Sequence, residues 1–365
     1  DRPRHEVLLG LDIPMLKLTG PVPESGIVNR SLEMLEAYIS TTDLGQSTDH
    51  LSVKTSMFEA LLYIFFSPFA HEYMRTRRAS YGLIDTRGPR FLYIYGPSQN
   101  GKSTFLHFAL KLLTGRPIEP LSREDFTKTR ILSAATTGTV FPLIFDDVDP
   151  SYSGLEDIFK SYWERWWKDQ FITPQIIITS NTPRLQEWAK SRVIRIDFDV
   201  HFAATAENRA KLAHLFNEDN PIFKWFSCLY MNELEKNELP SDDELYLARR
   251  VMKTLYQGAG RPLPPFFPSE PIEKLYDPGR RDWRDILYEL HKAVINQDGG
   301  RSIVTFPKDM QYWEVTHYQS SLPQTVKSKR KGSTLIIENP KEFQKWLGKR
   351  EPQNLFTRMF KQRGV

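Results

Sequence analysis

Residues 91–104 read Phe-Leu-Tyr-Ile-Tyr-Gly-Pro-Ser-Gln-Asn-Gly-Lys-Ser-Thr, an apolar run that leads into the pattern Gly-x-x-x-x-Gly-Lys-Ser. The apolar run predicts a buried strand, and the apolar spacing after the pattern predicts a helix. Between them, Gly96 and Gly101 let the backbone curl so that successive N–H groups point at phosphate oxygens, and the helix adds the positive end of its dipole. We therefore expect an α/β fold with a parallel sheet core and a phosphate-binding loop (P-loop).

The P-loop predicts a nucleoside triphosphate as the ligand, interpreted below as ATP, and Mg²⁺ as its metal ion. Lys102 is expected to reach the β- and γ-phosphate oxygens, and the Ser103 hydroxyl is expected to bind the Mg²⁺. Without the flanking strand and helix, the same letters would be a glycine turn with an accidental Lys-Ser pair. The expected ATP-binding residues are Gly96, Pro97, Ser98, Gln99, Asn100, Gly101, Lys102, Ser103 and Thr104.

A second buried strand ends in two carboxylates, because residues 141–147 read Phe-Pro-Leu-Ile-Phe-Asp-Asp. Such a strand places one carboxylate at the Mg²⁺ and another near the attacking water of an ATP-hydrolysing site. We assign the metal role to Asp146 and the water role to Asp147. Taken alone, an apolar strand that ends in Asp-Asp is more often followed by a solvated turn.

A third apolar strand, residues 175–181, ends in Asn181. In a parallel sheet the ligand lies beyond the carboxyl ends of the strands, so the P-loop, the aspartates and Asn181 should converge on one crevice. There Asn181 could orient the attacking water or contact the γ-phosphate. The alternative is a turn residue before Thr182-Pro183.

Two arginines accompany a fourth strand, in Ser-Arg192-Val-Ile-Arg195-Ile-Asp-Phe. An arginine from a neighbouring subunit can stabilise the charge on a transferring phosphoryl group. Arg192 is our candidate for that role, and an ordinary surface charge is the alternative. We interpret Arg195 as a strand residue that faces solvent.

These four segments together resemble motifs A, B and C and the arginine-finger segment of superfamily 3 helicases, AAA+-related ATPases of viral and plasmid replication proteins. The resemblance covers residues 86–200 and depends on Asn100 before Gly101, on the Asp-Asp pair and on the segment that begins at Arg192. It implies a homo-oligomeric ring, usually a hexamer, with ATP at the subunit interfaces and single-stranded nucleic acid, here interpreted as DNA, in the channel.

One segment departs from that family. Between motifs B and C, superfamily 3 helicases carry a β-hairpin whose basic tip grips DNA, whereas residues 151–170 predict one helix with an aromatic stripe. We interpret the stripe as packing against the core or another subunit, with a base-stacking surface as the alternative. Lys160, Arg165 and Lys168 remain as candidates for contact with a nucleic-acid strand.

The composition suits a protein without a membrane span. The apolar run near residues 60–70 is interrupted by Ser67-Pro68 and is too short to cross a bilayer. The single cysteine, Cys228, excludes an intrachain disulfide and suits a reducing compartment. We therefore expect a protein of the cytoplasm, or of the nucleic-acid compartment of the host cell, that is not secreted. Because the first residue is Asp rather than Met, a missing N-terminal domain is a further expectation.

Five regions are expected along the chain. Residues 1–85 should form an extended arm and a helical collar, residues 86–200 the ATPase core, and residues 201–260 a helical extension. A stiff proline linker, residues 261–278, should precede a small module of winged-helix type at residues 279–365.

The C-terminal module carries the basic excess of the chain. From residue 301 onward there are 13 Lys and Arg against 5 Asp and Glu, a surplus of +8, although the whole chain carries only +4. We expect a helix over residues 282–295 and a hairpin over residues 325–338. Its tip should bring Lys329, Arg330 and Lys331 to DNA phosphates, with a solvated loop as the alternative.

These expectations favour a ring-forming, ATP-hydrolysing motor of superfamily 3 helicase type that acts on DNA. The main alternative is an ATPase whose nucleotide controls assembly or switching of an absent N-terminal effector, for example in an anti-phage defence system, without unwinding. A non-enzymatic nucleotide-dependent scaffold is disfavoured by the complete set of hydrolytic residues.

Overall fold

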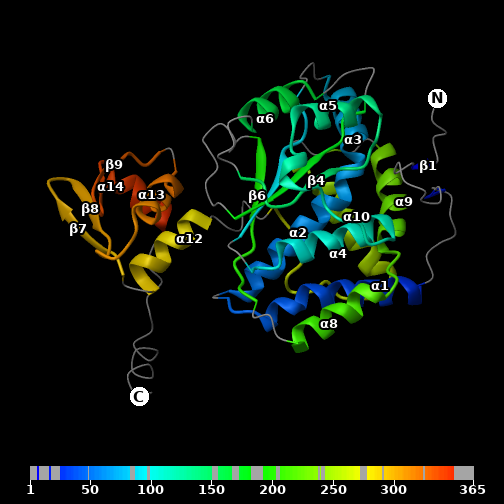
Figure 1. Cartoon of the computed structure of the whole chain (residues 1–365), viewed down its shortest axis with the longest axis horizontal. Helices are drawn as coiled ribbons and strands as arrows, with labels where there is room; N and C mark the ends of the chain where they lie inside the picture. The colour runs from blue at the N-terminus through cyan, green and yellow to red at the C-terminus, as the bar shows by residue number, and fades with distance from the viewer. Residues whose placement is uncertain are drawn as a thin grey trace. The chain divides into compact units, whose positions relative to one another are not determined.

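A computed structural model describes most of the chain, and its residues divide into two compact units, residues 1–272 and 273–365 (Figure 1). The described residues are 6–7, 16–17, 25–47, 49–82, 87–96, 99–149, 155–166, 172–181, 192–202, 206–236, 239, 243–271, 278–289, 292–323 and 325–348. No helix in these ranges is both long and apolar enough to cross a bilayer.

The first unit is built on a four-stranded parallel sheet with the strand order β4-β5-β3-β6. These strands are β3 (Phe91–Tyr95), β4 (Leu143–Phe145), β5 (Ile176–Ser180) and β6 (Val193–Asp197). Nearly all of their side chains are buried, which explains why the sequence reads as continuous apolar runs. The expected α/β fold with a parallel sheet is confirmed.

The register of this sheet brings three strand ends together. Tyr95, the last residue of β3, pairs with Ser180 of β5 on one side and with Asp197 of β6 on the other. Because β5 lies between β3 and β4, the segment that follows β5 lies between the P-loop and the segment that follows β4.

Among the described residues, three helices lie in the segments between these strands: α4 (Lys102–Thr114), α5 (Lys128–Thr136) and α6 (Leu155–Glu164). A 3₁₀ turn, Arg123–Asp125, precedes α5. In α6 the aromatic stripe is packing surface, because Phe159 and Tyr162 are buried against Phe91 of β3. The interpretation of this stripe as a packing surface is confirmed for the described residues.

Helices from two distant parts of the sequence form one helical body. They are α1 (Ser25–Ser40), α2 (His50–Phe66), α3 (Ala70–Tyr81), α8 (Ala206–Asn217), α9 (Ile222–Glu235) and α10 (Tyr246–Gly258), with 3₁₀ turns at Thr41–Leu44 and Ser67–Phe69. Two short strands, β1 (Glu6–Val7) and β2 (Leu16–Lys17), pair with each other. A buried ion pair of 3.0 Å joins Arg249 of α10 to Glu59 of α2.

The proline-rich stretch 261–271 is packed, although the sequence predicts a linker. Phe266 and Phe267 are buried, and both contact Phe58 of α2. Arg261 is fixed by an ion pair of 2.9 Å with Glu36 of α1. The sequence pattern fails here because the two phenylalanines among the prolines are apolar and are buried in the core. The boundary between the two units therefore comes later than expected, after residue 272.

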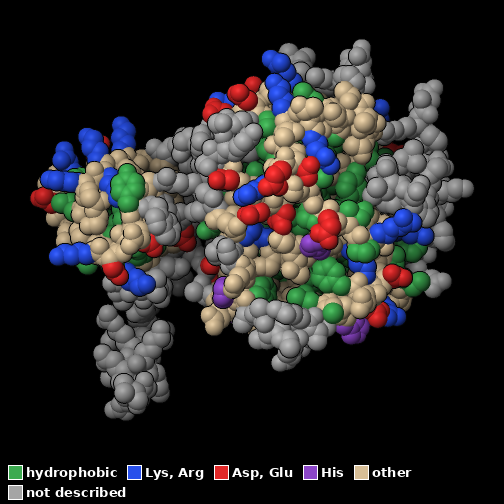
Figure 2. Space-filling model, in the orientation of Figure 1, with side chains coloured by type: hydrophobic (Ala, Val, Ile, Leu, Met, Phe, Trp, Pro, Cys, Tyr) green, Lys and Arg blue, Asp and Glu red, His purple; other side chains and the backbone are tan. Residues whose placement is uncertain are grey.

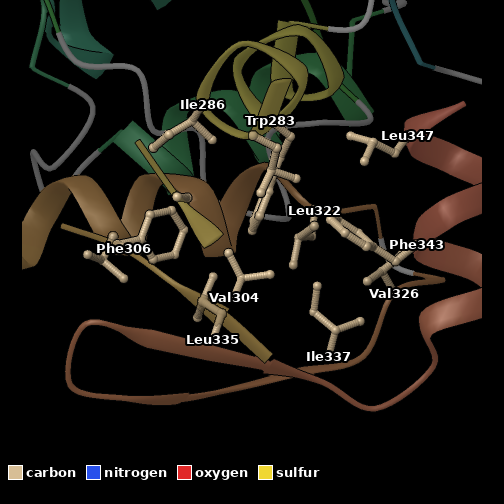
Figure 3. Close-up of a cluster of buried hydrophobic side chains, with 13 residues drawn as sticks. Trp283, Ile286, Val304, Phe306, Leu322, Val326, Leu335, Ile337, Phe343 and Leu347 are labelled. Atoms are coloured by element: carbon tan, nitrogen blue, oxygen red, sulfur yellow. The ribbon is translucent and has the colours of Figure 1, made fainter. Parts of the chain in front are cut away.

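The second unit folds around an antiparallel sheet of order β7-β8-β10-β9. Its elements are α12 (Pro278–Arg284), a π-helical turn (Asp285–Glu289), β7 (Val294–Asp298), β8 (Arg301–Thr305), α13 (Tyr312–Ser321), β9 (Ser328–Lys331), β10 (Thr334–Ile337) and α14 (Pro340–Leu347). Trp283 packs against both Phe306 and Phe343, which lie on either side of it in the core of this unit (Figure 3).

Two predictions for this unit are wrong in detail. The helix expected over residues 282–295 stops earlier, and Val294 and Ile295 begin strand β7, which pairs with β8. The turn of the last hairpin is Gly332-Ser333, so the basic residues before it belong to strand β9. Cross-strand pairing outweighs the helical pattern that the sequence shows there.

Candidate active site

The P-loop is shaped by contacts that only glycine permits. A Cβ atom on Gly96 would lie 1.4 Å from Nδ2 of Asn100, and Gly101 has a φ of +80°. The buried Asn100 amide donates to the carbonyl of Phe198 at 2.8 Å, so this side chain supports the loop from within. Gln99 also has a positive φ, +65°. Pro97 and Ser98 lie outside the described residues.

Lys102 begins helix α4 and is 6% exposed. Its ammonium donates to the Gly96 carbonyl at 2.6 Å, to Oδ1 of Asn100 at 2.9 Å and to Oδ1 of Asn181 at 2.8 Å. Burial lowers the pKa of Lys102 to about 8, while the negative charges of Asp146 and Asp147 act in the opposite direction. The ammonium is therefore held at the P-loop in a poorly solvated position.

The carboxylate end of the site is connected to Lys102 through an amide. Asn181 donates from Nδ2 to Oδ1 of Asp147 at 2.5 Å, while its own Oδ1 accepts from Lys102. The sequence expectation that these three strand ends converge is met by the geometry. Asp147 has a left-handed φ of +55°, a conformation that is uncommon for non-glycine residues but that Asp adopts more often than most.

Thr179 of β5 is part of this arrangement and was not expected from the sequence. Its hydroxyl donates to Oδ1 of Asp146 and accepts the backbone N–H of Asp147, the latter at 2.9 Å. The side chain thus fixes the positions of both consecutive aspartates. The signal in the sequence is a hydroxyl residue two positions before Asn181, directly after three consecutive isoleucines.

The residues expected to hold Mg²⁺ fit that ion. Ser103 lies exposed in the first turn of α4, and its hydroxyl has no hydrogen-bond partner among the described residues. Asp146 uses one oxygen for Thr179, which leaves the other oxygen for a metal. The described ranges contain no group of three or more His, Cys, Asp or Glu that could by itself hold a metal ion. Mg²⁺ suits such a site, because it commonly binds one or two protein oxygens together with phosphates and water.

The two arginines occupy different positions at the fourth strand, of which Arg195 is the central residue. Arg192 precedes β6 at the amino edge of the sheet, where it pairs with Glu164 at 2.6 Å and lies over the ring of Trp163. The P-loop follows the carboxyl end of β3, so Arg192 does not line the site of its own chain. Arg195 does not simply face solvent: it forms a two-pronged pair with Asp197 and lies over Tyr95.

The basic residues of the second unit do not form a single tip. Lys329 and Lys331 are exposed, and Lys329 pairs with Glu338 at 2.6 Å. Arg330 points to the other face of β9, where its guanidinium lies 3.8 Å from the ring centroid of Tyr312 and donates to the carbonyls of Tyr312 and Gly332. Lysines and arginines are spread over the visible face of this unit (Figure 2).

Two of the other three candidates for nucleic-acid contact lie among the described residues, at helix α6. Lys160 on α6 is paired with Glu156 one helical turn away, and Arg165 follows the end of that helix and is exposed. Lys168 lies outside the described residues.

Comparison with known proteins identifies the class of the first unit. Residues 25–184 match the family described as Aq_aa27 P-loop NTPase domain. Together with the parallel sheet and the P-loop geometry, this match shows that the chain contains a P-loop NTPase domain. No curated protein matches the chain.

Four chains of solved structures are similar to this one. One is titled "SCCmec type IV Cch - active helicase"; it is 12% identical, with 84% of this chain and 72% of that chain covered and a TM-score of 0.37. Another, "The X-ray structure of Inhibitor Bound to JCV Helicase", is 14% identical, with 64% and 69% covered and a TM-score of 0.25. Likeness at this level carries no argument about the function of the chain.

Proposed function

We propose that the chain is a Mg²⁺-dependent ATPase whose active site is the crevice at the carboxyl ends of β3, β4 and β5. The observation that carries the proposal is the hydrogen-bonded series from Lys102 through Asn181 to Asp147. This series joins a cation suited to the γ-phosphate to a carboxylate suited to the attacking water. A phosphate-binding loop without hydrolytic function would not need that connection.

In the proposed reaction, the backbone N–H groups of the P-loop and the Lys102 ammonium bind the β- and γ-phosphates. Ser103 and Asp146 would hold Mg²⁺, which neutralises phosphate charge when it is bound. Asp147 accepts a proton from the attacking water or orients it, and Asn181 fixes that carboxylate. When ATP enters, Lys102 exchanges its hydrogen bonds to Asn100 and Asn181 for phosphate oxygens.

The test separates binding from hydrolysis. We expect Lys102→Ala to abolish ATP binding, and Asp147→Asn to preserve binding while lowering the turnover rate by at least about 100-fold, because enzymes of this kind supply mainly positioning and charge. Binding is measured by calorimetry and turnover by phosphate release. Leu132→Ala, on an exposed position of α5, is the control and should change neither. Wild-type turnover in Asp147→Asn would show that this carboxylate has no catalytic role.

We further propose that the ATPase works as a homo-oligomeric ring of superfamily 3 helicase type on single-stranded DNA, with six subunits as the expected number. The support is the set of sequence motifs, the basic surplus of the C-terminal region and the exposed lysines of β9. In such a ring Arg192 would exchange Glu164 for the γ-phosphate bound by the neighbouring subunit.

A second candidate function is supported by α6. Where superfamily 3 helicases are expected to carry a DNA-gripping hairpin, the described residues 155–166 form a helix and its end, packed against the sheet. This favours an ATPase that switches the assembly of an attached effector without moving along DNA. Turnover measured with and without single-stranded DNA, alongside the mass in solution, decides between the two. ATP turnover that single-stranded DNA stimulates supports the motor. Turnover that rises with protein concentration and is the same with and without DNA supports the switch.

A further inference from the structure

The strand order determines where the rest of a bound nucleotide must lie. Lys102, Asn181 and Asp147 fix the γ-phosphate end on the β5 and β4 side of the P-loop. The remaining phosphates follow the P-loop away from that side. Adjacent strands are about 4.8 Å apart. A chain of three phosphates that begins on the β5 side is longer than this spacing, so the nucleoside at its other end lies past the end of β3. The segment on that side is the one that follows β6, residues 198–202.

This segment is tied to the P-loop by its backbone. The N–H of Phe198 donates to the carbonyl of Tyr95 at 2.8 Å, and the N–H of Phe202 donates to the carbonyl of Gln99 at 2.9 Å. His201 and Gln46 exchange two further backbone hydrogen bonds, of 2.8 and 2.9 Å. Residues 198–202 therefore form a fixed wall between the P-loop and the turn that precedes α2.

Phe202 presents an aromatic ring at this wall. A Cβ atom on Gly101 would lie 2.9 Å from its Cε2, and a Cβ on Gly45 would lie 3.3 Å from its Cδ1. Two glycines thus leave room for the ring directly beside the start of α4. Phe202 is partly exposed rather than fully buried, as a residue that contacts a ligand must be.

We propose that Phe202 is the nucleoside-binding residue of this site, on which the base of the bound nucleoside triphosphate stacks. The inference rests on the proposed nucleotide binding at the P-loop. Aromatic rings stack on a nucleobase with a stabilisation that corresponds to about 5- to 150-fold in affinity. Because His201 of the wall is hydrogen-bonded to Gln46 in the turn that precedes α2, the proposed base site is also linked to the helical body.

The structural alternative is that Phe202 only supports Gly101. The two roles differ in their effect on a ligand that has phosphates but no base. If the ring stacks on the base, Phe202→Ala weakens ATP and leaves inorganic tripolyphosphate unchanged. If the ring only shapes the P-loop, both ligands are weakened equally.

The experiment measures the Kd of Mg-ATP and of Mg-tripolyphosphate by calorimetry for the whole chain. We expect Phe202→Ala and Phe202→Leu to raise the Kd of ATP by about 5- to 150-fold, with that of tripolyphosphate within about twofold of wild type. Phe202→Trp should retain ATP affinity, and Phe202→Leu keeps apolar volume if the alanine variant does not fold. Tyr246→Ala, an exposed aromatic residue on α10, is the matched control.

Equal losses for both ligands in the leucine variant, or no loss for either, would overturn the inference. Wild-type protein that binds tripolyphosphate as tightly as ATP would also overturn it, and would leave the phosphate site intact. Wild-type protein that binds neither ligand would instead overturn the proposed function itself, together with this inference.

Discussion

Lys102 is surrounded by oxygen atoms that accept its hydrogen bonds, yet burial makes its proton easy to lose. Its pKa is lowered to about 8 because the ammonium is poorly solvated, and the carboxylates of Asp146 and Asp147 only partly offset that effect. A bound triphosphate would add negative charge beside the ammonium and hold its proton. The free protein and its ATP complex should therefore differ in proton content in mildly alkaline solution.

ATP affinity should accordingly fall with rising pH. Below about pH 8 Lys102 is charged in the free protein and affinity is constant. Above it the ammonium must regain a proton on binding, so the Kd should rise by up to about tenfold for each pH unit. Calorimetry between about pH 6 and about pH 10, in buffers of different ionisation enthalpy, measures both the affinity and the proton uptake.

Two variants serve as controls for this pH dependence. Lys102→Arg, whose guanidinium stays charged over this pH range, should bind ATP without the alkaline fall. Asp147→Asn removes a charge that raises the pKa of Lys102, so its affinity should begin to fall at a lower pH. A fall at the same pH in Lys102→Arg would assign the titration to another group.

At the residue scale, the sequence predicts site residues that belong to a recognisable motif. It does not predict residues whose role depends on which strands lie side by side. Lys102 and Asp147 are expected at one site because each follows a strand in a recognisable pattern. Thr179 supports both aspartates only because β5 lies beside β4, and the strand order is not written in a local pattern. The same holds for the contact between Asn100 and the carbonyl of Phe198, 98 residues away in sequence.

At the scale of elements, the position of the turn after β9 decides whether the three basic residues before it share one surface. Gly332 correctly indicates a turn, but the strand continues up to Lys331. Alternation along a strand then separates Arg330 from its two lysine neighbours. Arg330 pairs across the strands with the buried Leu335, on the face that packs against α13, whereas Lys329 and Lys331 face outward.

If β9 contacts DNA, its residues should differ in their effect. We expect Lys331→Ala to weaken binding of single-stranded DNA and to flatten the dependence of log Kd on log salt by about 0.7, the value for one phosphate contact. Arg330→Ala should instead lower the free energy of unfolding of the second unit by about 1 to 2 kcal/mol, through loss of hydrogen bonds and of the contact with Tyr312. Oligonucleotide titrations at several salt concentrations and thermal unfolding measure these effects.

Lys292→Ala, which removes an exposed lysine from the segment before β7, is the control for a general loss of charge. A salt dependence that flattens as much in this control as in Lys331→Ala would mean that DNA responds to net charge rather than to β9. An unchanged slope in Lys331→Ala would place the contact elsewhere, with Arg165 on the first unit as the next candidate.

At the scale of the whole molecule, the position of Arg192 limits how it can act. It lies at the amino edge of the sheet, and the five residues of β6 separate it from the edge that carries the P-loop, a distance of about 16 Å. The arginine can therefore contribute to hydrolysis only at the site of another subunit. To reach the site of another subunit, the Arg192 side chain would have to break its ion pair with Glu164 and its contact with the Trp163 ring.

Mixing two inactive variants tests this arrangement. Arg192→Ala keeps its own P-loop, and Lys102→Ala keeps its arginine, so a mixed oligomer contains some complete sites. We expect partial recovery of ATP turnover in the mixture, whereas each variant alone is inactive. Native mass spectrometry confirms that mixed oligomers form. Mixed oligomers without recovery would contradict a shared site, and Glu164→Ala, which frees the arginine, should leave turnover at least at the wild-type level.

The packing of residues 261–271 onto α2 has a consequence for protein synthesis. Phe58 and Glu59 lie in the first sixth of the chain, but their partners Phe266, Phe267 and Arg249 are made about 200 residues later. At ribosomal rates of about 5 to 20 residues per second, α2 is synthesised roughly 10 to 40 s before these partners. During that interval Phe58 and Glu59 lack these partners, and a chain that ends before residue 266 lacks both phenylalanines that pack on Phe58.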